Sequence, residues 1–322
     1  TQCEQDGISN MASPTNVLII GAGAIGGFYG AILNRAGARV SVVARSRGKV
    51  LRERGYTIKS PLGDLSFRPE VHASAGGVTT PPDYLIVALK VVEGVDRVGI
   101  IRPAVGPNTT IVLIQNGIGI EQEVADAFPD NPLVSCLAFV AVSRVAPGEL
   151  DHKAYGALTF GDYPRGAGEQ AQRLSELLQA GGVEARLSDN VVGERWRKAV
   201  WNTPFNPGSV LAGGADTQTL LTTPGGQELI ESLMHEVCAV AAADGHPLPE
   251  GIVEGNIRST LKMPAYHNSM ALDFLNGRPM EIEPILGNVV RTAERLGVPV
   301  PRLATVYALI RLLVANQAKR RS

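Results

Sequence analysis

Cysteine is scarce in this chain. Only three cysteines occur among 322 residues, they lie far apart, and no two of them form a CxxC pair. The composition therefore excludes a small disulfide-stapled protein and favours a reducing, cytoplasmic compartment. Histidine is sparse as well: the five histidines show neither HxxxH nor HxH spacing, so the sequence gives no reason to expect a metal site.

Net charge is nearly absent too. Lysine and arginine number 30 against 31 acidic residues, which argues against a surface for nucleic acid or for an acidic membrane. Long apolar runs are missing: the longest candidate, Leu133 to Val142, contains Ser135 and is shorter than the ~18 residues that a membrane helix needs. The first residues, TQCEQDGISN, are polar, so residues 1–13 are expected to form a disordered tail or an extension.

The length and the order of the patterns predict two domains. Up to about residue 188, short apolar runs of strand type alternate with amphipathic segments, which is typical of a largely parallel, doubly wound sheet. Beyond that point only helical patterns follow, and prolines separate them. We therefore expect an α/β protein with an N-terminal Rossmann-type doubly wound sheet over residues 14–188 and a C-terminal all-α domain over residues 189–322.

Individual elements follow from the same patterns. A hairpin is expected over 56–60 and 65–68, with further strands at 84–89, 110–115, 133–142, 157–160 and 184–187. The helices expected between these strands span 91–101, 119–128 and 168–180. In the second half, helices are expected at 191–202, 225–244, 251–262, 268–275, 281–296 and 301–318.

The clearest functional pattern follows the first predicted strand. Val17 to Ile20 is an apolar run, and a glycine turn comes directly after it, consisting of Gly21, Ala22, Gly23, Ala24, Ile25 and Gly26. In a dinucleotide-binding unit the first glycine permits a tight turn, the second lets the backbone approach a pyrophosphate, and the third allows close helix–strand contact. A helix N-terminus attracts the negative charge of the pyrophosphate. The pattern predicts a dinucleotide-binding site.

The end of the second predicted strand indicates which dinucleotide binds. NAD enzymes usually carry a carboxylate there, whereas this chain has Arg45, followed by Ser46 and Arg47. A guanidinium offers a fork of donors that fits the 2′-phosphate of NADP(H). Arg45 therefore predicts NADP(H) as the cofactor. The alternative is that Arg45 is a solvated arginine at a strand end.

A second pattern lies near the start of the helical half. Lys198, Asn202 and Asn206 are spaced four residues apart and would share one helix face. A lysine with two amides suits a ketone substrate, because reduction places negative charge on the ketone oxygen. Pro204 and Pro207 are expected to distort or end this helix, and the alternative interpretation is a solvated lysine with asparagines at a helix end.

Together these motifs resemble one family, that of 2-dehydropantoate 2-reductase, also called ketopantoate reductase. The resemblance runs from Asn16 to Arg302 and rests on Gly21–Gly26, Leu89-Lys90, Gln115–Gly119, Trp196–Lys198, Asn202, Asn206-Pro207, Ser269-Met270, Asp273, Gly277-Arg278, Glu281-Ile282, Gly287 and Gly297–Pro301. The C-terminal motifs are specific, because a generic dinucleotide-binding protein does not need them.

The resemblance implies a role for each matching position. Lys198 would be the general acid, and Glu281 would reach across the cleft toward the cofactor ribose and help to orient the reacting groups. Substrate would be held by Asn116, Lys198, Asn202, Asn206 and Ser269. Lys90 and Asn116 would lie beside the cofactor, with Asn116 near the nicotinamide.

Other interpretations of these residues stay open. Glu281 could be a first-turn acid that serves a helix dipole, Ser269 a helix cap, and Asp273 a structural partner of a nearby arginine. The chain also departs from the family: Asp216 stands where an asparagine is common, Gly208 stands where a larger residue is usual, and Tyr266 precedes Asn268-Ser269 in the loop expected to contact substrate. These departures concern the substrate more than the chemistry.

The predicted function is the NADPH-dependent reduction of 2-dehydropantoate to (R)-pantoate in pantothenate and coenzyme A biosynthesis. One alternative is the same chemistry on another branched or aromatic 2-oxo acid. A second, of a different class, is a non-catalytic NADPH-binding sensor. The expected partner is a small 2-oxo acid, without nucleic acid or membrane, and a homodimer is a possible assembly.

Overall fold

The computed structural model describes residues 13–45 and 48–321. Its strands are β1 (Asn16–Ile20), β2 (Arg39–Val43), β3 (Tyr56–Lys59), β4 (Leu65–Phe67), β5 (Glu70–His72), β6 (Tyr84–Val87), β7 (Thr110–Ile114), β8 (Leu133–Ala146), β9 (Glu149–Asp162) and β10 (Ala185–Leu187). In the described residues they form one sheet in the order β4-β3-β9-β8-β7-β6-β1-β2-β5, with β10 beside β9. The predicted tail, residues 1–13, falls almost wholly outside the described residues.

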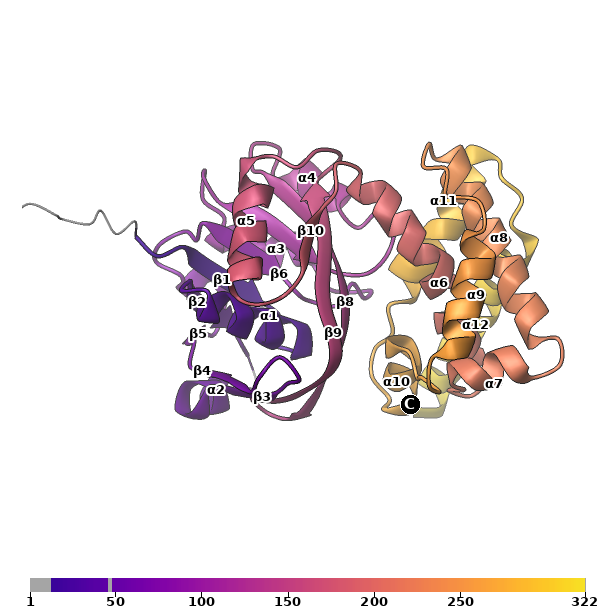
Figure 1. The fold of residues 1–322 in the computed structure, drawn as a ribbon, viewed down its shortest axis with the longest axis horizontal. Coiled ribbons are helices and arrows are strands. Elements are labelled where there is room, and N and C mark those ends of the chain that lie inside the picture. The colour runs from indigo at the N-terminus through magenta and orange to yellow at the C-terminus, as the bar shows by residue number, and fades with distance from the viewer. Residues whose placement is uncertain (1–12, 46–47, 322) are drawn as a thin grey trace, which may run out of the picture.

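The middle of the sheet is parallel. β5, β2, β1, β6, β7 and β8 all run in one direction, and the antiparallel β9 follows β8. Alternate residues of β1 enter different cores: Val17 and Ile19 pack with α1 (Ala24–Arg35) and α5 (Glu169–Ala180), whereas Leu18 and Ile20 pack with α3 (Arg97–Ile101) and α4 (Gln122–Ala127). Helices therefore cover both faces, and the predicted N-terminal Rossmann-type fold is confirmed (Figure 1).

The β8–β9 hairpin is longer than the sequence patterns predict. Each strand has 14 residues, whereas strands were expected only at 133–142 and 157–160. A Pro147-Gly148 turn joins them, and Gly148 adopts a φ of +80°. The hairpin extends from the sheet along the side that faces the helical half (Figure 1). The outer half of the hairpin projects beyond the buried core of the sheet, so its sequence mixes polar and apolar residues.

The prediction of a helix over 91–101 is also wrong for the first half of that range. Only Arg97–Ile101 is helical, and the preceding residues form a loop. Asp96 explains the late start: its side chain accepts a hydrogen bond from the Gly99 N–H at 2.8 Å and so caps the helix. Within the loop, Gly94 has a φ of +80°, which a helix does not accommodate.

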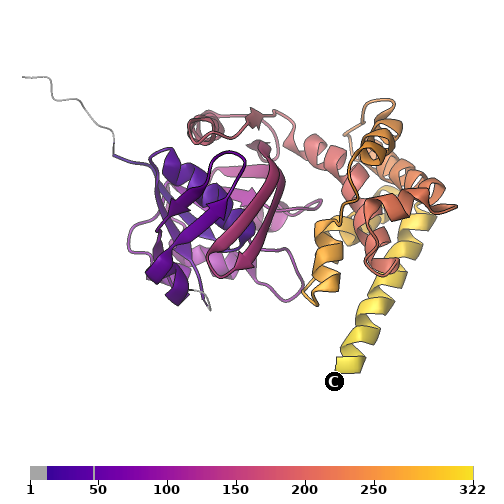
Figure 2. The same ribbon diagram turned by 60° about the horizontal axis from the view of Figure 1, so that its bottom comes forward.

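The second half is helical, as predicted. It contains α6 (Val191–Leu211), α7 (Thr217–Thr222), α8 (Gly226–Ala243), α9 (Ile252–Lys262), α10 (Ser269–Leu275), a π-helical turn (Glu283–Gly287), α11 (Asn288–Leu296) and α12 (Pro301–Arg321). The short α2 (Gly48–Arg54) and α7 were not predicted. α6 leads from the sheet into the helical half, and α12 projects beyond it (Figures 1 and 2). Within the described residues, none of the helices is both long and apolar enough to cross a membrane.

α6 corrects the expectation about the two prolines. The helix continues through Pro204 and Pro207 to Leu211, so each proline removes one backbone hydrogen bond without ending it. Both prolines are buried, and Phe205 between them stacks on Trp201 with ring centroids 4.7 Å apart. Packing against the neighbouring helices therefore outweighs the local preference. As a result, positions 198, 202 and 206 do share one continuous helix.

Candidate functional site

The turn after β1 has the shape that a bound dinucleotide requires. Gly21 has a φ of +115°, and a Cβ there would lie 2.6 Å from the Ala88 carbonyl carbon. A Cβ on Gly26 would overlap the Gly21 carbonyl oxygen, so both outer glycines are needed for packing. Gly23 differs, because a Cβ there would meet nothing within 4 Å.

The open space at Gly23 lies at the start of α1. No side chain caps that helix, and its first turn contains no acidic residue. Free N–H groups and the positive end of the helix dipole therefore face the space beside Gly23. These residues fit the pyrophosphate of a dinucleotide, as the sequence predicts.

Arg45 lies just beyond β2 and is exposed. Its position beside β1 places it at the same edge of the sheet as the glycine turn, where open α/β sheets bind ligands. Arg47, the other candidate for a 2′-phosphate, lies outside the described residues.

Lys90 follows β6 and reaches across to the helical half. Its ammonium forms an ion pair with Asp273 of α10, and Arg278 approaches the other Asp273 oxygen at 3.5 Å. The structure thus gives Asp273 the structural pairing with an arginine that the sequence suggested, and adds Lys90 as a second partner. A cofactor role for Lys90 stays a prediction.

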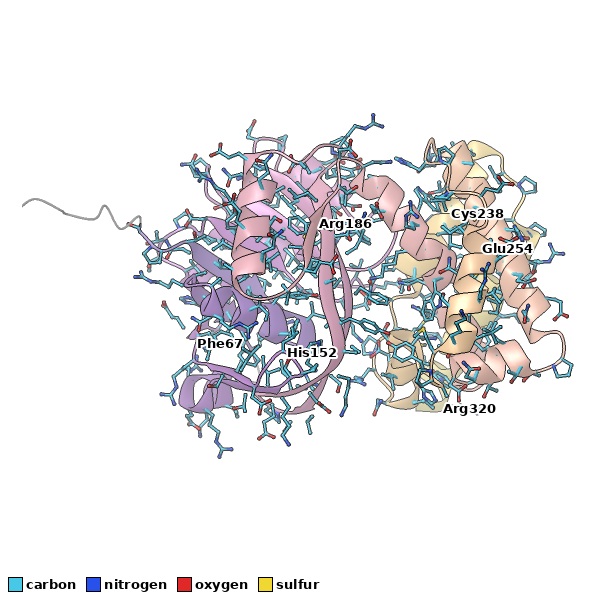
Figure 3. All side chains as sticks on the ribbon, in the orientation of Figure 1. Phe67, His152, Arg186, Cys238, Glu254 and Arg320 are labelled. Atoms are coloured by element: carbon cyan, nitrogen blue, oxygen red, sulfur yellow. The ribbon has the colours of Figure 1, made fainter. Side chains whose placement is uncertain are left out.

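Lys198 sits where α6 passes the end of the sheet. Its Nζ donates to Asn116 Oδ1 and to the Ala138 carbonyl, both at 2.8 Å. Asn116 follows β7 and Ala138 belongs to β8, so two strands hold the ammonium from one side. The alternative of a fully solvated Lys198 does not fit these contacts. Side chains from the hairpin and from the helices occupy the space between the two halves (Figure 3).

Arg195, three residues before Lys198, was not among the predicted site residues. It is buried, pairs with the buried Glu121, and donates from Nε to Ser135 Oγ at 2.9 Å. Its Nη1 also donates to the Gln115 carbonyl at 2.8 Å and to the Gly117 carbonyl at 3.1 Å. Arg195 therefore fixes α6 to the turn that carries Asn116. Its spacing of three from Lys198 was a signal that could have found it.

Glu281 is buried and faces the first half of the chain. Its Oε1 accepts a hydrogen bond from the Val91 N–H at 3.0 Å, so the carboxylate spans the two halves instead of capping its own helix. Burial raises the pKa of Glu281, while the Val91 hydrogen bond and Lys90 act in the opposite direction.

The charges around Lys198 change its acidity. Burial and, to a smaller extent, the nearby Arg195 guanidinium lower the pKa of Lys198 to about 8, although the Glu281 carboxylate acts to raise it. A lysine with a pKa near 8 is mostly an ammonium at neutral pH and still releases its proton readily. This is the acidity expected of a general acid.

The π-helical turn after Glu281 connects the site's elements. Thr203 of α6 donates to the Ile285 carbonyl at 2.8 Å, and the Ile118 N–H donates to the Pro284 carbonyl at 2.9 Å. A small cavity of about 10 Å³, room for about one water molecule, lies between this turn and Lys198. It is lined by Gly117, Ile118, Leu137, Arg195, Lys198, Ala199, Asn202, Thr203 and Ile285.

The remaining predicted substrate residues occupy different surroundings. Asn202 lines the cavity beside Lys198. Asn206 is buried, and its Oδ1 has no hydrogen-bond partner among the described residues. Ser269 is exposed at the start of α10, and the cap there is Asn268, whose side chain accepts from the Ala271 N–H at 2.9 Å. The interpretation of Ser269 as the cap was wrong.

A larger cavity of about 560 Å³ lies on the other side of the π-helical turn. The loop after Lys90 forms one wall, and α11 and α12 form the other, with Glu283, Arg291 and Tyr307 among its lining residues. Neither Lys198 nor Asn116 lines it, so it is separate from the cluster around the lysine.

Comparison with known proteins identifies relatives along nearly the whole chain. The family model described as "Ketopantoate reductase PanE/ApbA" matches residues 17–165, and its C-terminal counterpart matches residues 190–314. A 2-dehydropantoate 2-reductase from Nostoc sp. is 32% identical over 301 residues, covering 92% of this chain and 94% of that protein.

Solved structures agree with this assignment. The crystal structure of 2-dehydropantoate 2-reductase from Methylococcus capsulatus is 51% identical, with a TM-score of 0.89 over 94% of this chain and 97% of the other. A D-mandelate dehydrogenase in a ternary structure with NADH and anilino(oxo)acetate has a TM-score of 0.82, covering 92% of this chain and 98% of the other. At 21% identity, this second likeness concerns the fold alone.

Proposed function

The chain belongs to the ketopantoate reductase (PanE/ApbA) family, and from this premise we propose that it reduces 2-dehydropantoate to (R)-pantoate with NADPH. Family membership supports 2-dehydropantoate reduction in general. The observation that carries the finer proposal is the Lys198 ammonium, held by Asn116 and the Ala138 carbonyl.

The cofactor would be held by the glycine turn, from Gly21 to Gly26, with its pyrophosphate over the open space at Gly23. Arg45 would bind the 2′-phosphate, because a guanidinium matches a phosphate with paired donors. Lys90, Asn116 and Glu281 would complete this side of the site. The bound nicotinamide supplies the hydride that reduces the ketone carbon.

Lys198 would protonate the ketone oxygen. Negative charge develops on that oxygen during reduction, and an ammonium in a partly buried site stabilises it more than water does. Asn116 and the Ala138 carbonyl aim the ammonium, and the Glu281 carboxylate favours its charged form. After Lys198 gives up its proton, solvent restores it.

The polar groups of the substrate would meet the amides of α6. Asn202 lines the cavity next to Lys198, and Asn206 presents a buried acceptor that a substrate hydroxyl would satisfy. Ser269 is proposed to join them when substrate binds. This donor and acceptor set supports catalysis rather than a non-catalytic sensor, which would have no use for a lysine with a lowered pKa.

The predicted domain boundary is part of the proposal. We place it at residue 188, between β10, which ends at Leu187, and α6, which begins at Val191. The cytoplasmic location and the homodimer stay predictions.

The direct test is to follow NADPH absorbance while the protein is mixed with 2-dehydropantoate and with a panel of other 2-oxo acids. Consumption of NADPH with 2-dehydropantoate, and a much slower reaction with NADH, is expected. Turnover only with another 2-oxo acid would move the proposal to that substrate. NADPH binding without turnover of any substrate would instead support the sensor.

A further inference from the structure

The backbone of β9 is distorted in the middle of the β8–β9 hairpin. Phe139 of β8 pairs with Ala157, and the next residue, Val140, pairs with Tyr155. Gly156 is therefore an extra residue of β9, which makes a β-bulge. Tyr155 has a φ of +69° and Gly156 a φ of +123°. A bulky residue such as tyrosine rarely adopts this conformation, so the surrounding structure has to hold it.

Two buried side chains hold three consecutive carbonyls of this bulge. The His152 Nε2 lies 3.0 Å from the Ala154 carbonyl oxygen and 3.1 Å from that of Tyr155. The Tyr29 hydroxyl, from α1, donates to the Gly156 carbonyl at 3.2 Å. His152 is 2% exposed and Tyr29 is fully buried. A bulge interrupts the ladder, and these two side chains satisfy backbone groups at the interruption.

The surroundings of His152 fix its ring and its tautomer. Carbonyls only accept hydrogen bonds, so Nε2 carries the proton, and Nδ1 accepts from the Ser60 hydroxyl at 2.8 Å. The Ser60 oxygen in turn accepts from the Leu62 N–H at 3.1 Å. Phe28 of α1 packs on the imidazole with ring centroids 4.4 Å apart. His152, labelled in Figure 3, is therefore held between the turn after β3 and α1.

The bulge lies close to the carbonyl that holds the Lys198 ammonium. The pairing of β8 with β7 ends at Cys136. Ala138 lies two residues farther along β8 and pairs with Leu158, which is two residues after Gly156 in β9. The position of the Ala138 carbonyl therefore depends on β9 and its bulge. That carbonyl accepts a hydrogen bond from Lys198 Nζ at 2.8 Å.

We propose that His152 and Tyr29 are positioning residues for the proton donor: they hold the bulge of β9, and through it they place the Ala138 carbonyl against Lys198. The inference rests on the proposed function, because it assigns these residues a part in that reaction. The same contacts join the hairpin to α1, whose N-terminus is proposed to bind the cofactor pyrophosphate. The helix that holds the hydride donor and the strand that aims the proton donor thus keep a fixed relation to each other.

The test measures kcat for the reduction of 2-dehydropantoate with NADPH. His152→Leu removes the donor to two carbonyls and should lower kcat about tenfold, because small displacements of a catalytic group reduce the rate. His152→Gln should restore most of this loss, since its amide N–H can donate in place of Nε2. Tyr29→Phe loses one hydrogen bond and should lower kcat about threefold. NADPH affinity, measured by fluorescence titration, should stay level in all three variants.

Two further measurements separate positioning from a merely structural role. The Ala138 carbonyl favours the charged form of Lys198, so its displacement in His152→Leu should lower the pKa of Lys198 and move the fall in kcat to a pH below about 8. In a Lys198→Ala background, His152→Leu should change kcat little, because the group that it positions is gone.

Tyr84→Phe is the matched control for Tyr29→Phe. Tyr84 is buried in the same half of the chain, and its hydroxyl also donates to a backbone carbonyl, that of Gln170, at 2.9 Å. Tyr84→Phe should lower Tm about as much as Tyr29→Phe does and leave kcat unchanged. If His152→Leu does not fold, the comparison of Tyr29→Phe with this control decides.

The outcomes distinguish this inference from the reductase proposal. A lowered Tm with unchanged kcat and an unchanged pH profile would overturn the inference and leave the reductase proposal standing. The same fold-loss of kcat from His152→Leu with and without Lys198 would overturn it as well. Absence of turnover by the wild type with every 2-oxo acid, 2-dehydropantoate included, would end both.

Discussion

The glycine turn after β1 and the cluster around Lys198 serve the two partners of one proposed reaction, yet they are built differently. The turn is contiguous in sequence and works through its backbone: Gly21 and Gly26 pack too closely for side chains, and Gly23 stays open. The cluster draws Asn116, Ala138, Lys198 and Glu281 from four distant segments and depends on side-chain charge.

This difference shows where each function is vulnerable. A backbone site tolerates changes at its neighbours as long as the glycines and the helix start remain. The cluster depends on its charged groups as well as on its hydrogen bonds, because burial, Arg195 and Glu281 together set the pKa of Lys198. Substitutions in the cluster around Lys198 should therefore mainly lower the reaction rate. Substitutions near the glycine turn should mainly weaken cofactor binding.

The largest effect is expected at Lys198. Lys198→Ala should lower kcat by about 10²–10⁴-fold, because positioned acid catalysis contributes that much, while NADPH affinity and Tm change little. Lys198→Arg should also be poor, since a guanidinium keeps its charge and does not release a proton near neutral pH. The exposed Arg197 is next to it on α6, and Arg197→Ala should keep kcat. A near-normal kcat for Lys198→Ala would place the proton donor elsewhere.

Arg195 should matter most for folding. Arg195→Met leaves the buried Glu121 without its cation and should reduce the free energy of unfolding by about 3–5 kcal/mol in urea denaturation. Arg173→Met removes an exposed pair with Glu169 and should cost less than about 0.5 kcal/mol. Similar losses for both variants would show that Arg195 does not hold α6 against the sheet.

Substitution of Arg45 tests the proposed binding of the cofactor's 2′-phosphate. A charge-assisted hydrogen bond to the 2′-phosphate contributes about 1.5–3 kcal/mol, so Arg45→Ala should weaken NADPH binding by roughly 10- to 150-fold and NADH binding much less. Titration of each cofactor by its fluorescence measures both constants. Arg39→Ala, at the other end of β2, is the matched control. Equal weakening of the two cofactors would remove Arg45 from the phosphate site.

Asp216 should have the smallest effect. Its Oδ1 accepts from the Thr219 N–H at 2.8 Å, so it caps α7, and that hydrogen bond lowers its pKa. Asp216→Ala should cost about 1 kcal/mol of unfolding free energy, whereas Asp216→Asn keeps the cap and should cost little. The sequence suggested a role in substrate choice, and a changed KM for 2-dehydropantoate in Asp216→Asn would restore that role.

The sequence predicts local features of this protein better than distant contacts. The glycine turn follows from neighbouring residues, and the shared face of Lys198, Asn202 and Asn206 follows from helical spacing. The Ala138 carbonyl carries no side-chain signal, and the Arg195–Glu121 pair joins residues 74 positions apart in the chain. The long hairpin was missed although Pro147-Gly148 is a turn signal, because its outer half lacks a core pattern.

The helical half shows the same limit. Pro204 and Pro207 locally favour a helix end, and burial in the helical core overrides them. The π-helical turn after Glu281 depends on donors from Thr203 and Ile118, which lie far away in sequence. Tertiary contacts therefore decide the local structure that positions Lys198 and the residues around it.

The central claim is that Lys198, with a pKa near 8, gives the proton, and the pH dependence of kcat for ketone reduction tests it most directly. Because the ammonium is the active form, kcat should be level below about pH 7 and fall as the pH rises through about 8. The reverse oxidation needs the neutral amine and should rise over the same range. A kcat for reduction that stays constant up to about pH 10, the ordinary range of lysine, would contradict the account.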